Sequence, residues 1–270
     1  MSEHSAIGWT DATWPIVAGC TYASPGCSNC WAVRDSWRLA HNPHDKVRRM
    51  FEGTVRKTED SKLVWTGLVR PLPDRLDWPL KWKSGRRIFV SNMSDLFHPE
   101  VPFDFVDRVY EVMAKCPHHT FQVLTKHPDR MREYVRQALP NVWHGVTVED
   151  QKRAAERLPL LLETPSAIRW ISAEPLLEPV DLTPWLTRID WVVAGGESAQ
   201  TRRNTRPFEL AWARSLREQC AAGGARFFMK QLGTCSDASG TLPPGKTSRY
   251  KWHEPQHWPE DLRVQQFPAG

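Results

Sequence analysis

The sequence lacks any apolar run long enough to cross a lipid bilayer. Across its 270 residues no stretch of about eighteen consecutive apolar residues occurs. The first residues, Met1 to His4, also lack the basic and apolar regions of a secretion signal. We therefore expect a cytoplasmic protein with no membrane partner.

A large excess of one charge is also missing. The chain carries 36 lysines and arginines against 31 acidic residues, a formal net charge of +5. A dedicated nucleic-acid-binding protein more often concentrates lysine and arginine in a visible basic run. The mild basicity is compatible with an anionic substrate and does not require one.

Cysteine is scarce, and half of it is clustered. Of six cysteines, Cys20, Cys27 and Cys30 fall within eleven residues. A disulfide between two of these cysteines would leave the third thiol unpaired and would need an oxidising compartment. A zinc site prefers four ligands, and the sequence offers no obvious fourth ligand. Three thiolates with an open position suit an iron–sulfur cluster. The sequence therefore predicts Cys20, Cys27 and Cys30 as metal ligands.

After Gly85, apolar runs alternate with amphipathic segments. Strand starts recur roughly every twenty to thirty-five residues, which is the length of a βα unit. Expected strands lie at 14–19, 88–90, 121–124, 142–146, 168–171, 191–194 and 226–229, and expected helices at 31–40, 106–114, 130–138, 151–162 and 208–222. This alternation predicts an α/β fold with six or seven parallel strands, closed as an incomplete (β/α) barrel.

The expected domain organisation is one barrel over residues 1–234, followed by an irregular tail over 235–270. Residues 41–84 interrupt the alternation with charged and proline-containing segments, so we expect an insertion there. A functional lid and a surface elaboration both remain open for it. The tail is rich in glycine, proline and tryptophan without a helical period, and we expect it to pack on the barrel.

Polar residues follow nearly every expected strand. A parallel barrel directs the carboxyl ends of its strands to one mouth, where catalytic residues gather. Helix capping is an alternative role for some of these residues. Capping does not account for Lys126, Glu174 and Lys230, which we predict to be catalytic.

Several motifs together resemble a known family. The spacing Cys20-x6-Cys27-x2-Cys30 resembles a lengthened three-cysteine loop of radical S-adenosylmethionine (SAM) enzymes. With segments 91–97, 145–149, 172–176 and 195–198, it resembles a phage-associated three-Cys-motif, radical-SAM-like family of unassigned activity. The resemblance covers residues 7–234. It implies a radical-SAM-type partial barrel, a 4Fe-4S cluster and SAM as cofactors, an electron donor, and a three-Cys-motif partner protein.

The resemblance also implies roles for individual residues. In many radical SAM enzymes a Gly-Gly-Glu motif after the second strand holds the cofactor, whereas here Gly195-Gly196-Glu197 follows about the sixth strand. The predicted cofactor-binding residues are therefore Ser91, Asn92 and Asp95, which follow the second strand, together with Thr147, Glu149 and Glu197. For Glu197 a contact with substrate remains an alternative.

Three arginines follow this motif within five residues. Arginine forks bind phosphate or carboxylate in pairs, so Arg202, Arg203 and Arg206 are the predicted substrate-binding residues.

The leading hypothesis is a radical SAM enzyme in which an adenosyl radical acts on a nucleic acid or nucleotide, for base modification or damage repair. One alternative is a structural zinc or iron–sulfur protein that binds nucleic acid without catalysis, with His4, His41 or His44 as a fourth ligand. Another is a metal-independent enzyme acting through the predicted catalytic lysines and glutamate.

Overall fold

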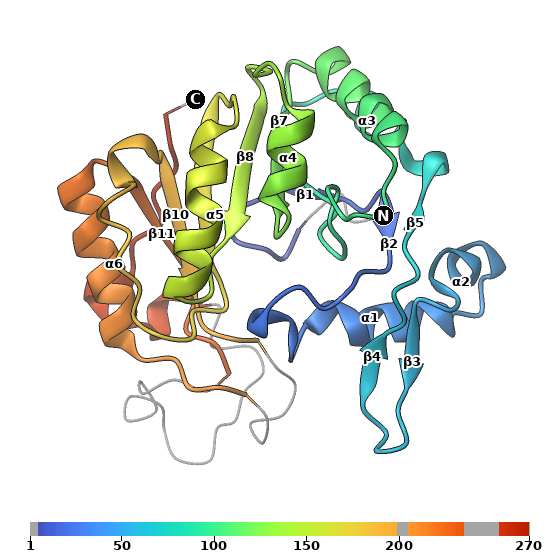
Figure 1. The fold of residues 1–270 in the computed structure, drawn as a ribbon, viewed down its shortest axis with the longest axis horizontal. Helices are drawn as coiled ribbons and strands as arrows, with labels where there is room; N and C mark the ends of the chain where they lie inside the picture. The colour runs from blue at the N-terminus through green and yellow to red at the C-terminus, as the bar shows by residue number, and fades with distance from the viewer. Residues whose placement is uncertain (1–4, 199–204, 235–253, 270) are drawn as a thin grey trace.

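A computed structural model describes residues 5–198, 205–234 and 254–269 of the chain (Figure 1). Two predicted substrate-binding residues, Arg202 and Arg203, lie outside the described residues.

The central element is a seven-stranded, all-parallel sheet with the order β1-β6-β7-β8-β9-β10-β11. Its strands follow one another in the sheet as they do in the chain, so every crossover steps in the same direction and the sheet curls into a half-barrel. This confirms the predicted α/β fold with an incomplete barrel. The strands are β1 (Ala12–Trp14), β6 (Arg87–Val90), β7 (Thr120–Thr125), β8 (Val142–Thr147), β9 (Ile168–Ala173), β10 (Trp191–Gly195) and β11 (Arg226–Gln231).

Four helices cover the outer face of the half-barrel, as Figure 1 shows. They are α3 (Phe103–Lys115), α4 (Pro128–Tyr134), α5 (Gln151–Glu163) and α6 (Leu210–Gly223). Their apolar faces pack on the sheet and form one continuous core with it. Helix α4 ends before the expected residue 138, because Val135 is already extended. No described helix combines the length and apolar character that crossing a bilayer requires.

The expected first strand, 14–19, was wrong, because the run divides at Pro15. Strand β1 ends at Trp14, and β2 (Val17–Ala18) pairs antiparallel with β5 (Arg70–Pro71) in a separate small sheet. Proline has no N–H to donate, so it cannot continue a parallel ladder between two strands. The cysteine segment therefore follows β2 of this small sheet and does not follow a strand of the half-barrel directly.

Residues 41–84 form a compact addition beside α1 (Trp31–Ala40). They contain α2 (Asp45–Phe51), which the sequence pattern did not predict, and a hairpin of β3 (Val55–Lys57) and β4 (Leu63–Trp65). The hairpin and α2 both contact α1, and the hairpin projects away from the barrel in Figure 1.

An aromatic layer fills the inner face of the sheet. Trp143, Trp170, Trp191 and Phe228 come from the first halves of their strands and pack together with Trp9. This layer closes the end of the half-barrel opposite the strands' carboxyl ends. The indole rings serve here as core packing, and the polar side chains lie at the opposite end of the strands.

The described part of the tail covers the edge strand β11. The N–H of Met229 donates to the carbonyl of Val264 (2.8 Å), and the N–H of Gln266 donates to the carbonyl of Phe227 (3.0 Å). Trp258 is buried in the core next to α6. The tail thus occupies hydrogen-bonding groups that an open sheet edge would expose.

Candidate metal centre

The three predicted metal ligands lie in one tight loop between β2 and α1. The N–H of Cys27 donates to the carbonyl of Ser24 (2.9 Å), and the N–H of Cys30 donates to the carbonyl of Cys27 (3.2 Å). The thiols of Cys20, Cys27 and Cys30 are free and partly buried. Gly19 begins the loop at φ +83°, with Leu68 so close that a β-carbon would lie 2.0 Å from its carbonyl oxygen. Only glycine fits there.

The thiols influence one another electrostatically. Burial raises the pKa of Cys20 well above its usual range, and Asp95, Cys30 and Cys27 raise it further. Burial also raises the pKa of Cys30, which Lys126 partly offsets. A bound cation would reverse this preference by stabilising the thiolates. In the metal-free chain, burial therefore favours the neutral thiols of Cys20 and Cys30.

A buried carboxylate, Glu149, holds one side of the loop. It follows β8, its side chain is fully buried, and it accepts a hydrogen bond from the hydroxyl of Ser24. Lys126 forms an ion pair with Glu149 and donates to Ser24 (3.2 Å), while Arg157 binds the other carboxylate oxygen (3.0 Å). Burial raises the pKa of Glu149, but the two cations outweigh it and hold that pKa below its usual range. Gly26 packs directly on this carboxylate.

A second carboxylate, Glu197, holds the other side of the loop. It follows β10 and accepts from the side-chain amide of Asn29 (2.8 Å). Arg206 forms an ion pair with Glu197 and also donates to the carbonyl of Pro25 (2.9 Å). Burial raises the pKa of Glu197, and the hydrogen bonds from Arg206 and Asn29 lower it to a net value below its usual range. Both carboxylates are thus ionised anchors of the cysteine loop.

The turn after β6 contacts the start of the cysteine loop. Ser94 donates from its hydroxyl to the carbonyl of Gly19. Asp95 accepts from the hydroxyl of Thr125 (2.7 Å) and from the N–H of Lys126 (2.8 Å). This arrangement ties the ends of β6 and β7 to the start of the cysteine loop.

Two polar atoms of the same turn have no partner among the described residues. They are the hydroxyl of Ser91 and the side-chain carbonyl of Asn92. Residue Ser91 has a backbone φ of +54° and is 2% exposed. Unpaired buried polar atoms are costly and mark places where a ligand or water completes the hydrogen bonding. They fit the predicted role of these two residues toward a polar cofactor.

The remaining predicted residues lie on neighbouring strand ends. Lys230 of β11 forms an ion pair with Glu174, directly after β9, and both side chains remain partly exposed, at 17% and 16%. Thr147 is buried, and its carbonyl accepts from Arg157 (2.7 Å). The strand ends thus carry paired charges on both sides of the mouth.

The three cysteines are the candidate donors for a metal group. Within residues 5–198, 205–234 and 254–269, no three His, Cys, Asp or Glu side chains are grouped closely enough to bind one metal ion. The three free cysteines and the unpaired polar atoms of the neighbouring turn are compatible with a cluster and a bound cofactor.

Several functional contacts were not predicted from the sequence. Glu149 is bound by Arg157 and Ser24, and Glu197 is bound by Asn29. Only Arg157 gave a signal, because it occupies a position on the apolar stripe of α5, between Ala154 and Leu161. A charged residue on such a stripe needs a buried partner.

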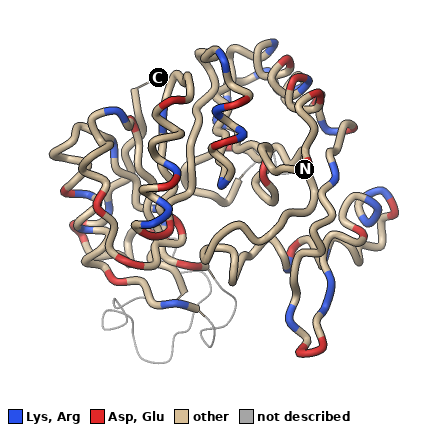
Figure 2. The backbone as a smooth tube through the Cα atoms, in the orientation of Figure 1, with Lys and Arg blue, Asp and Glu red and all other residues tan. Residues whose placement is uncertain are grey.

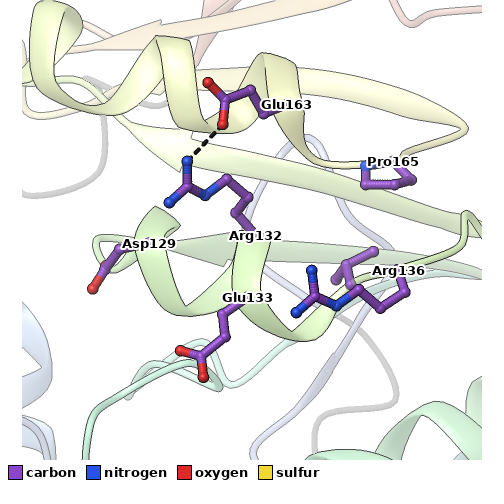
Figure 3. A pocket seen from close by; sticks show the side chains of 7 residues that line it. Asp129, Arg132, Glu133, Arg136, Glu163 and Pro165 are labelled. Atoms are coloured by element: carbon purple, nitrogen blue, oxygen red, sulfur yellow. Dashed lines mark hydrogen bonds and ion pairs between the residues drawn. The ribbon is translucent and has the colours of Figure 1, made fainter.

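Two hollows of the described surface lie away from the cysteine loop. One of about 680 Å³ lies between α4 and the end of α5, on the outer face of the barrel, where Arg132 pairs with Glu163 (Figure 3). Another of about 630 Å³ lies between α2 and β5. Neither is lined by a cysteine of the loop or by the carboxylates that anchor it.

Comparison with known proteins adds a family and no activity. No curated protein and no solved structure shows a significant match to the chain. Residues 4–264 match the model of a family described as "Protein of unknown function (DUF5131)". This match extends over nearly the whole chain, including the cysteine loop, the half-barrel and most of the tail. The chain belongs to the DUF5131 family.

Proposed function

We propose that this protein is a radical-SAM-like enzyme in which Cys20, Cys27 and Cys30 hold a 4Fe-4S cluster. One observation carries the proposal: a loop with three free thiols is anchored by Glu149 and Glu197 over the carboxyl mouth of a parallel half-barrel. In barrels of this kind the mouth is where catalytic groups gather. When bound, the cluster and SAM would supply one-electron, hydrogen-abstracting chemistry.

The chain's own residues would prepare this site. Glu149 and Glu197 serve the cofactors by fixing the loop, since their oxygens are occupied by loop and arginine donors. Ser91 and Asn92, with unpaired polar atoms, are available to polar groups of SAM. Second-layer partners of this type set the orientation of metal ligands.

The substrate would meet the strand ends that keep partial exposure. Lys230 and Glu174 form a charge pair there, and Lys126 is 20% exposed on the opposite side of the mouth. The formal net charge of +5 is compatible with an anionic substrate, and we propose a nucleic acid or nucleotide. The aromatic layer below would keep water from entering through the far end of the half-barrel.

The test is anaerobic purification and iron–sulfur reconstitution of the full chain, followed by iron and sulfide analysis. After SAM and a reductant are added, formation of 5′-deoxyadenosine is measured. We expect a cluster and deoxyadenosine in the wild type, and loss of both in Cys27→Ala. Cys220→Ala is the matched control, since this free thiol is buried in α6, and it should retain both.

Stoichiometric zinc without a cluster and without SAM cleavage would refute the proposal in favour of a structural metal site. A cluster that persists in Cys27→Ala would refute the ligand assignment.

A further inference from the structure

Three of the four large apolar side chains that stand exposed in the described residues surround the cysteine loop. Tyr22 is 63% exposed, Trp31 41% and Leu68 42%. The hydroxyl of Tyr22 lies 3.4 Å from that of Ser28, and Leu68 lies against Gly19 at the start of the loop. Exposed apolar groups gathered around a candidate site mark an interaction surface.

The exposed face of α1 extends this surface with positive charge. Trp31, Arg34 and Arg38 recur at intervals of three and four residues, so they lie on one side of the helix. Arg34 is exposed and forms no ion pair with a described residue, and the side chain of Arg38 is 69% exposed, with a 3.8 Å contact to Asp35. The two arginines are about 6 Å apart along the helix axis. They place two guanidinium groups on this face, the first about one helical turn after Cys30.

The adjoining hairpin adds to the positive field. Figure 2 shows basic residues on β3 and just before β4, and acidic residues at the tip of the hairpin. Arg56 and Lys57 are exposed on β3, which packs against α1. Residues 41–84 hold ten basic and six acidic residues, a net of +4 out of +5 for the whole chain. Most of the net positive charge of this mildly basic protein is therefore carried by residues 41–84, whose helix α2 and hairpin contact α1.

We propose that this surface binds a single-stranded segment of nucleic acid, with bases stacked on Tyr22 and Trp31 and phosphates on Arg34 and Arg38. Exposed aromatic rings beside a row of cations are the elements by which proteins hold single strands. A single strand is narrow enough to follow one helix face, whereas a stable protein partner needs about 800 Å² of surface on each side. The inference rests on the proposed function, because it assigns the substrate-binding surface of the proposed cluster site.

The test uses the full chain without metal and a fluorescein-labelled oligothymidine of about twelve nucleotides, with binding followed by fluorescence anisotropy at low salt. Loss of one stacking ring should weaken binding about 5- to 150-fold in Trp31→Ala, and Trp31→Phe should restore most of the affinity. Leu80→Ala is the matched control, because Leu80 is 46% exposed in the short turn against α3 and should not matter.

Salt dependence tests the arginines separately. Replacing Arg34 and Arg38 by glutamine removes two phosphate contacts, so the slope of log K against log[salt] should become shallower by about 1.4. Arg108→Gln, at an exposed position of α3, should leave the slope unchanged.

Three outcomes would overturn the proposal. They are no oligonucleotide binding at low salt, equal affinity of wild type and Trp31→Ala, and binding of an acidic electron-donor protein that depends on Trp31 while oligonucleotide binding does not. The last result would assign the surface to a protein partner. Because the assay needs neither cluster nor SAM, its failure is distinguishable from failure of the proposed function.

Discussion

The substitution Glu149→Gln tests whether the cysteine loop is held by buried charge. Gln has nearly the same shape as Glu but no negative charge. The carboxylate of Glu149 is fully buried and faces Lys126 and Arg157, whose side chains are 20% and 7% exposed. The substitution therefore leaves two cations without their counter-ion, one of them almost entirely out of water.

The magnitude follows from this burial. Removing one partner of a buried ion pair costs about 3–5 kcal/mol, because the remaining charge stays desolvated. Lys126 is able to turn toward solvent, so we expect the lower end, about 3 kcal/mol. For a protein of this size that corresponds to a fall of about 6–12 °C in Tm.

The assay is thermal unfolding of the metal-free protein, combined with the rate at which iodoacetamide labels Cys27. Ser24 and Gly26 both contact Glu149, so a weakened anchor should also expose the loop and speed labelling. Glu163→Gln is the matched control, because its ion pair with Arg132 has side chains 57% and 45% exposed. An exposed pair contributes about 0–1 kcal/mol, so little should change. If both variants behave alike in stability and labelling, the anchoring role of Glu149 is wrong.

Two further predictions concern packing and pH. In Gly26→Ala the new β-carbon would lie 2.6 Å from the side chain of Glu149, so we expect a loss of about 1–3 kcal/mol in the free energy of unfolding and less iron after reconstitution. Gly8→Ala, whose β-carbon would meet its nearest neighbour at 3.8 Å, should cost little, and an equal loss in both variants would contradict the close contact. For His144, burial lowers the pKa to about 3, so its contribution to stability is complete above about pH 6.5 and declines as the pH falls toward 3. Between pH 7 and 5 this amounts to about 2 kcal/mol, to be measured by urea unfolding, and a His144→Gln variant with an unchanged pH slope would refute it.

The main elements of the half-barrel were predictable because each rests on a local pattern. Buried parallel strands appear as short apolar runs, and the covering helices show apolar positions three and four residues apart. The first strand was not, since proline at position 15 moves the apolar residues that follow it into another sheet. Helix α2 was missed because its charged residues conceal a short apolar face that ends at Phe51.

The sequence could predict which polar residues lie at the strand ends, but not which of them pair with one another. Polar residues directly after predicted strands are expected to lie together, because parallel strands end at one edge of the sheet. The contact between Asn29 and Glu197 joins residues 168 positions apart, and no sequence period encodes it. Arg206, which we predicted to bind substrate, forms an ion pair with that same glutamate and donates a hydrogen bond to the loop backbone.

The sequence by itself determined the alternation of strands and helices, the clustering of three thiols and the supply of charged strand ends, since these depend on residue type and near spacing. Only the tertiary structure decided which charges neutralise one another and where the cysteine loop lies. The reason is physical: a carboxylate such as Glu149 is ionised in the interior because cations from two other elements reach it, and their positions are set by packing across the sheet.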